Sequence, residues 1–336
     1  MVYPGSGNRH TFFLTTAVVH AMGEPAWIVE PLPPGAAPVP NGLPVFRIAC
    51  ENDDEPTRRL GEDSEILFTT PASGEYVARV TDVRGFGAPA DFHYKLEIRQ
   101  PRPSFTVRIE NPNPSVSPGS GREVSFAITR SEGFDGPVRI LVENLPAGFT
   151  FHGPLEIEAG QLRARGVLSA AADAAAPDEA ADKAVSVRAL ADIGGREVEQ
   201  QVGSLGDIKL GEAPKLTVAI VPAPGSSVVA REGEPLVFAI RPGETIKAKV
   251  LVERHGFGDR IDFGRDGQAD RNLPHGVFID NLGLNGLLVV EGETDREFSI
   301  RAAPKARPGR RPFHLLAAPD GGQASPPAII EVLPAR

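Results

Sequence analysis

Short runs of apolar residues, separated by Gly and Pro, dominate the pattern of the chain from residue 104 onward. Residues 104–110 alternate strictly between polar and apolar side chains, and residues 125–129 and 138–142 are rich in Val, Ile and Phe. This period and this residue choice suit strands that are buried on one face. Similar runs predict the later strands at 185–189, 197–202, 216–221, 246–252, 277–279, 286–290, 297–302, 313–317 and 329–332. The pattern therefore predicts an all-β chain.

One sequence unit occurs twice. Residues 144–148 read Asn-Leu-Pro-Ala-Gly, and residues 272–276 read Asn-Leu-Pro-His-Gly, 128 positions later. A Gly-Phe pair precedes each copy, at 133–134 and 256–257. Pro fixes φ and Gly permits a turn, so each copy predicts a corner between two strands. The spacing matches one β-sandwich domain and predicts two similar antiparallel sandwiches. The alternative is a chance similarity between Gly- and Pro-rich β segments.

The first 102 residues show weaker strand patterns. Strand-like runs lie at 12–14, 27–29, 43–48, 64–69, 75–80 and 92–99. Between residues 30 and 44 proline and glycine recur so often that a loop or linker is expected. Pro101-Arg102-Pro103 then predicts a stiff linker to the next unit.

Residues 41–100 carry a resemblance to a known family. An acidic turn at Asn52-Asp53-Asp54, the pair Asp63-Ser64, the turn 71–76 and a closing strand at 94–98 follow one another in order. In this order they resemble the bacterial pre-peptidase C-terminal domain, although the first strands of that family are missing or replaced by the Pro-rich segment. The resemblance implies a jelly-roll-like β-sandwich of the kind attached to secreted enzymes and surface proteins. It also implies that the chain is the C-terminal part of a larger extracytoplasmic protein.

The rest of the chain resembles the Ig-like modules found in tandem beside such domains. This resemblance depends on the Asn-Leu-Pro-x-Gly corner and on a Glu-x-Gly turn before a strand. The predicted architecture is three β-sandwiches in series, with a pre-peptidase-like domain at 1–102 and Ig-like sandwiches at 103–212 and 213–336. One oddity is the Ala-, Asp- and Glu-rich stretch 168–183, where Pro177 interrupts any helix; a loop is expected, with one helical turn after Pro177.

Composition and charge narrow the classes of function. The chain has 36 Gly and 33 Pro among 336 residues, too many for long helices, and a net charge of −9. By residue count the three predicted domains carry −4, −6 and +1, so none offers a basic surface for nucleic acid. Arg307, Arg310 and Arg311 form a small basic cluster, interpreted as a solvated loop.

Membrane and redox signals are weak. No apolar run is long enough to span a membrane. Residues 11–22 are apolar, but they lack the basic lead and processing site of a signal peptide. Cys50 is the single cysteine, so no disulfide can form within the chain.

No catalytic signature is present, and no cofactor is predicted. The histidines stand at 10, 20, 93, 152, 255, 275 and 314, without metal-ligand spacing to Glu or Cys. No serine lies in a Gly-x-Ser-x-Gly elbow. Isolated histidines of this kind are expected to be structural, and the chain is predicted not to be an enzyme.

The strongest candidate site is a calcium site in the first unit. Asp53, Asp54 and Asp63 bracket one connection and fall on the acidic positions of the pre-peptidase family. Calcium takes clustered carboxylate oxygens of this kind. The alternative is a solvated turn in which the side chains bond their own backbone. A second acidic group, at Asp259, Asp262, Asp266 and Asp270, has a spacing that fits no EF-hand.

Two functions from different classes remain. The first is a non-catalytic extracytoplasmic array of modules, acting as a spacer, adhesion or protein-interaction region of a larger secreted or cell-surface protein. The second is a carbohydrate-binding accessory region of a secreted hydrolase or peptidase. Aromatic platforms for sugars are scarce, because Trp27 and the tyrosines at 3, 76 and 94 are the only Trp and Tyr residues. The expected partner is a protein or a glycan at the cell surface.

Overall fold

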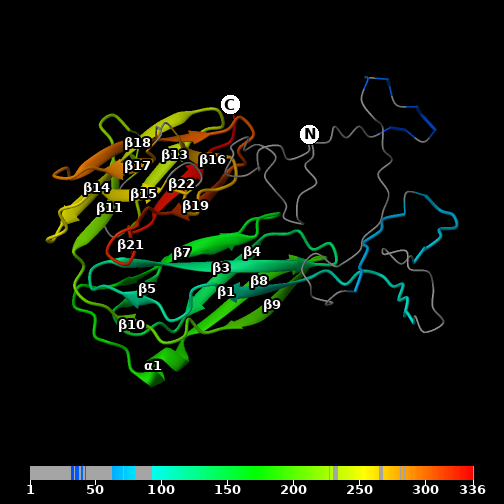
Figure 1. Cartoon of the computed structure of the whole chain (residues 1–336), viewed down its shortest axis with the longest axis horizontal. Helices are drawn as coiled ribbons and strands as arrows, with labels where there is room; N and C mark the ends of the chain where they lie inside the picture. Colours follow the sequence, from blue (N-terminus) through cyan, green and yellow to red (C-terminus); the bar gives the residue numbers. More distant parts are fainter. Residues whose placement is uncertain are drawn as a thin grey trace. The chain divides into compact units, whose positions relative to one another are not determined.

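The computed structural model describes residues 32–33, 35–37, 39–40, 42, 63–70, 72–80, 93–226, 228–229, 234–264, 268–280, 282 and 285–335. The chain divides into two compact units, Met1–Pro103 and Ser104–Arg336. The second unit contains all the strands shown in Figure 1.

In the first unit no strand is present among the described residues, so the predictions at 64–69, 75–80 and 93–99 are wrong for those residues. A strand needs a hydrogen-bonded neighbour and an apolar face to cover, and neither is found there. Val77 is 90% exposed and Ile98 80% exposed. The pre-peptidase-like sandwich therefore stays a prediction.

The second unit begins with a sandwich of two sheets, called the first sandwich. One sheet has the order β1-β3-β7-β5, and the other β6-β4-β8-β9; a short parallel pair, β2 and β10, closes the edge. The bounds are β1 Ser104–Ile109, β2 Ser115–Val116, β3 Gly121–Ser131, β4 Val138–Glu143, β5 Phe149–Phe151, β6 Leu155–Ile157, β7 Arg163–Ala170, β8 Ser186–Ile193, β9 Arg196–Gly203 and β10 Lys209–Leu210. The expected helical turn after Pro177 is confirmed as α1, Glu179–Ala184, which Asp178 caps.

The second sandwich follows the same plan in its first sheet, which has the order β11-β14-β18-β16. Its other strands form a four-stranded sheet, β12-β13-β22-β19, and a separate pair, β15-β17. The bounds are β11 Leu216–Pro222, β12 Val228–Val229, β13 Val237–Ile240, β14 Thr245–Arg254, β15 Ile261–Gly264, β16 Val277–Asp280, β17 Leu287–Val289, β18 Asp295–Ala302, β19 Gly309–Phe313, β20 Leu316–Ala317, β21 Gln323–Ala324 and β22 Ala328–Val332. The all-β prediction is confirmed.

Each sandwich has its own apolar core between its sheets. In the first, Phe105, Phe126 and Leu168 are fully buried, and in the second Phe238 and Phe313 pack edge to face. The two cores are separate clusters within one compact unit. The boundary at 212/213 stays a proposal that these clusters support.

The repeated sequence unit forms the same corner in both sandwiches. Asn144 and Asn272 have φ values of 57° and 65°, and the glycines four positions later have 82° and 85°. In each copy the N–H after that glycine donates to the carbonyl of the proline, at 3.0 Å and 2.9 Å. Asn and Gly are the residues that adopt this left-handed backbone most readily. The sequence repeat therefore corresponds to a structural repeat.

The strands β20 and β21 leave the second sandwich and join the first. They form a hairpin, and Ala324 of β21 pairs with Gly121 at the start of β3. This hairpin extends the β3 sheet beyond the end of β1 (Figure 1). The two sandwiches thus share one sheet.

Candidate functional site

The most unusual chemistry of the described residues lies where the two sandwiches meet, a region called the junction. Beside the strand pairing, the Ser120 hydroxyl donates to Gln323 Oε1 at 2.5 Å, and both residues are buried. Gly121 makes this approach possible. A Cβ at that position would lie 2.6 Å from Val167 Cγ1 and 3.0 Å from the Ala324 carbonyl oxygen. Only glycine therefore fits without a shift.

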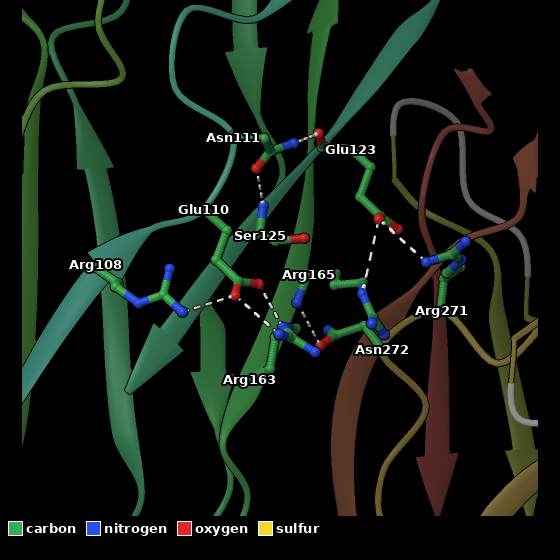
Figure 2. A network of polar contacts seen from close by, with 9 residues as sticks. All are labelled: Arg108, Glu110, Asn111, Glu123, Ser125, Arg163, Arg165, Arg271 and Asn272. Atoms are coloured by element: carbon green, nitrogen blue, oxygen red, sulfur yellow. Dashed lines mark hydrogen bonds and ion pairs between the residues drawn. The ribbon is translucent and has the colours of Figure 1, made fainter. Parts of the chain in front are cut away.

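A buried carboxylate forms the centre of the junction. Glu123 of β3 accepts a hydrogen bond from His314 Nε2 at 2.8 Å and another from Arg271 Nη1 at 3.3 Å, both from the second sandwich. Arg165 of β7 places Nε 3.7 Å from the same carboxylate. Figure 2 shows Arg165 and Arg271 on two sides of Glu123. One carboxylate is therefore shared by two guanidinium groups and an imidazole.

The environment shifts the pKa values of this group. Burial would by itself raise the pKa of Glu123, but the hydrogen bond from His314 and the charges of Arg271 and Arg165 outweigh it and leave the pKa below its ordinary value. His314 is 1% exposed, and burial lowers its pKa although Glu123 opposes the shift. The pair is therefore an ionised carboxylate and a neutral imidazole near pH 7.

A second set of contacts flanks the first. Arg311 of β19 donates to the carbonyl oxygen of Glu156 at 3.1 Å and lies 3.2 Å from the Glu158 carboxylate. The backbone N–H of His275 donates to Glu158 Oε2 at 2.9 Å. The Arg311 side chain is only 11% exposed. The interpretation of this arginine as part of a solvated loop is wrong, because a strand carries it into the junction.

The second Asn-Leu-Pro-x-Gly corner also belongs to the junction. Asn272 accepts a hydrogen bond from the backbone N–H of Arg165 at 3.2 Å and donates to the Pro312 carbonyl at 2.8 Å. Asn144, its equivalent in the first sandwich, is exposed. The same corner is therefore a plain turn in one sandwich and a contact between sandwiches in the other.

The junction also contains a pocket of about 550 Å³. Arg165 lines it from the first sandwich, and the second sandwich supplies the rest, including Arg260, Asp262, Gln268, Arg271 and Asn285. The volume lies in the ordinary range for small-ligand sites.

The polar contacts of the junction hold the two sandwiches together. Glu123 and His314 are buried and bonded to each other, so they are closed to a substrate as an acid–base pair. Within the described ranges no three His, Cys, Asp or Glu side chains are grouped so that they could hold a metal ion. The expectation of structural histidines fits His314, and it fits His152, which is half-buried and lies 3.2 Å from the Ser169 hydroxyl.

The predicted calcium site is only partly covered by the structure. Asp63 is described and exposed, whereas Asp53 and Asp54 lie outside the described residues, as does Cys50. Calcium binding there stays a prediction, which calorimetric titration after chelation would test. In the second acidic group, Asp262 pairs with Arg260 at 2.9 Å and Asp270 accepts from the Ile279 N–H at 3.0 Å, while Asp266 is not described.

Sequence reasoning missed the junction because its residues are far apart in the chain. Glu123 and His314 are 191 positions apart, and Glu123 and Arg271 are 148 apart. One signal was available in the sequence: Glu123 directly precedes the largely apolar run Val-Ser-Phe-Ala-Ile at 124–128, all of which the structure buries. A carboxylate at such a place needs a partner.

Comparisons with known proteins find solved structures that align with this chain, but they identify no family. No protein-family model and no curated protein matches the sequence, so the pre-peptidase resemblance has no support from them. Solved structures that align include a protein of unknown function from Porphyromonas gingivalis W83 at 9% identity (68% of this chain, 99% of that chain, TM-score 0.24). Others are the fibronectin(III)-like modules of Clostridium thermocellum CbhA at 18% identity (69% and 96%, TM-score 0.19) and the D0-D1 domain of intimin at 9% (67% and 97%, TM-score 0.23). At these scores the likeness carries no inference about function.

The described part of the chain contains no helix with the length and apolar character needed to cross a membrane.

Proposed function

We propose that the chain is a non-catalytic, extracytoplasmic array of modules in which residues 104–336 act as a rigid two-sandwich spacer within a larger secreted or cell-surface protein. A spacer of this kind holds an attached adhesion or protein-interaction region at a fixed distance and orientation. The expected partner is a protein or a glycan at the cell surface.

The observation that carries this proposal is the junction. Two sandwiches joined by a flexible linker move independently, because interfaces between domains are ordinarily small and polar. Here a strand pairing, a buried carboxylate with cations around it and the Arg311 contacts all act across the same interface. Each of these interactions would break if the sandwiches rotated apart.

Charge supports the same arrangement. The first sandwich contributes the carboxylates Glu123, Glu156 and Glu158, and the second contributes Arg271 and Arg311. By residue count the predicted domains carry −6 and +1. Complementary charges of this sign bring the two sandwiches together in one register.

A distance measurement between the sandwiches tests the proposal. Spin labels at Arg196→Cys on β9 and Arg296→Cys on β18, both exposed, report the separation in the full chain when Cys50→Ser removes the native thiol. We expect a single narrow distance distribution from pulsed electron spin resonance, and a broad one when Glu123→Gln is added. A broad distribution without that substitution would contradict a rigid spacer.

The carbohydrate-binding alternative assumes aromatic platforms for the sugar, so it depends on exposed aromatic rings. Tyr94 and Tyr76 are both exposed, and the Tyr76 hydroxyl donates to the carbonyl of Ala72 at 2.5 Å within its turn. Aromatic rings that bind sugars stack against the sugar face and must be free to do so. A glycan array tests this alternative: loss of binding in Tyr94→Ala would favour it, and binding that Tyr94→Ala leaves unchanged would contradict it.

A further inference from the structure

The pocket at the junction has an excess of positive charge. Among the described residues, its lining includes three arginines, Arg165, Arg260 and Arg271, and one carboxylate residue, Asp262. Arg260 and Asp262 form an exposed ion pair at 2.9 Å, so their charges compensate each other. The remaining two arginines share Glu123, one carboxylate for two cations.

Of the three arginines that line the pocket, Arg165 has the most unused donors toward the described residues, because Arg260 and Arg271 each donate one side-chain hydrogen bond. The group has five N–H donors, and its one ionic contact within the described part of the chain is the approach of Nε to Glu123 at 3.7 Å. Its backbone is fixed by the hydrogen bond from its N–H to Asn272. Burial lowers its pKa, and the charges of Arg271 and Arg163 add to that effect while Glu123 opposes it. A second carboxylate beside Arg165 would relieve this unfavourable environment.

The rest of the wall is suited to hydroxyl groups. Gln268 and Asn285, which line the pocket, have side-chain amides that can donate and accept hydrogen bonds, and the Asp262 carboxylate can accept them. The register of β15 shifts between Asp262 and Gly264, which marks a bulge at the wall. Bulges bend a strand and re-aim its side chains, and they recur beside binding sites. The pocket therefore combines arginine side chains that can bind an anion with polar side chains that can bind hydroxyl groups.

We propose that this pocket binds a uronic acid residue of an acidic glycan, with Arg165 bonding the sugar carboxylate and Gln268, Asn285 and Asp262 bonding its hydroxyls. A guanidinium fork matches a carboxylate through two parallel hydrogen bonds. The hydroxyl partners favour a sugar acid over an acidic peptide side chain, which has no hydroxyls to offer. This proposal is independent of the rigid-spacer function, because binding and the distance between sandwiches are measured separately.

Calorimetric and NMR titration of the full chain with D-glucuronate tests it. We expect saturable binding of glucuronate, none of D-glucose, and none of N-acetylglutamate. Arg165→Gln should abolish binding, and Arg260→Gln should weaken it about tenfold, because Asp262 would then repel the anion. Arg301→Gln, which removes an exposed arginine paired with Asp280 elsewhere on the second sandwich, should leave binding unchanged.

Several outcomes would overturn the proposal. They are no binding of glucuronate by the unaltered chain, equal binding of glucose, binding of N-acetylglutamate but not of glucuronate, or an affinity unaffected by Arg260→Gln. Arg260→Gln keeps the proposal testable if Arg165→Gln disturbs folding, because Arg260 is exposed and, among the described residues, it forms an ion pair only with Asp262.

Discussion

The first sheets of the two sandwiches have the same strand order, whereas their second sheets differ. In the first sandwich β4 pairs with both β6 and β8, so the second sheet is continuous. In the second sandwich the equivalent pair, β15 and β17, stands apart from the sheet that contains β19. The chain leaves β19 after Phe313, and residues 314–324 supply His314 and the β20–β21 hairpin to the junction. The second sheet of the second sandwich is therefore interrupted, and the segment that follows β19 forms the interface with the first sandwich instead.

The largest expected effect comes from the carboxylate that the hairpin segment covers. Glu123→Gln leaves Arg271 and Arg165 without a counter-charge, so the free energy of unfolding should fall by about 3–5 kcal/mol, the usual loss when one partner of a buried ion pair is removed. Urea unfolding of the full chain measures it. The matched control is Glu143→Gln. Glu143 lies on β4 and forms an exposed ion pair with Arg188 of β8, so its loss should cause no resolvable change in stability. Equal stability of both variants would contradict a structural role for Glu123.

The two corners offer the next comparison. Glycine keeps the left-handed backbone at either asparagine, so Asn272→Gly removes only its side-chain bonds to Arg165 and Pro312. We expect a loss of about 2–4 kcal/mol, because two part-buried backbone groups lose their partners. Asn144→Gly in the first sandwich should be close to neutral. Similar losses in the two variants would show that the corner, and not the junction, accounts for the effect.

A smaller effect is expected where β21 meets β3. Gly121→Ala places a methyl group against Val167 and the Ala324 carbonyl, which should cost about 1–3 kcal/mol of stability. It should also broaden the distance distribution between the spin labels. Gly309→Ala on β19, where a Cβ meets nothing within 4 Å, is the control. A narrow distribution in Gly121→Ala would show that the pairing is dispensable.

The smallest effect is a dependence on pH. The pKa of His314 is lowered from 6.5, so below pH 6.5 the unfolded chain takes up a proton that the folded chain resists, and stability falls. The pKa of Glu123 is lowered from 4.5, so the stability that the ionised Glu123 contributes is lost only below that pH. Since burial lowers the pKa of His152 as well, His314→Gln should reduce the loss of stability between about pH 7.5 and about pH 5.5 without abolishing it. Parallel curves for the two proteins would exclude His314 as the group that responds.

The sequence was sufficient for local features. Alternation and the Asn-Leu-Pro-x-Gly corner predicted most strands of both sandwiches, because these features depend on neighbours a few positions away. It failed in the first unit, where strand-like residues such as Val77 lie exposed without pairing. It also failed at the junction. Glu123, Arg271 and His314 come together only through the hairpin, and nothing local to any one of them indicates the other two.

The shared hairpin has a consequence for how such proteins are inherited. A sandwich that completes its own sheets can be copied, deleted or moved as a single cassette. Here a cut between residues 212 and 213 would remove from β3 the strand that borders Gly121 and would strip the hairpin of its support. The pair, and not the single sandwich, is therefore the smallest piece that recombination could transplant intact.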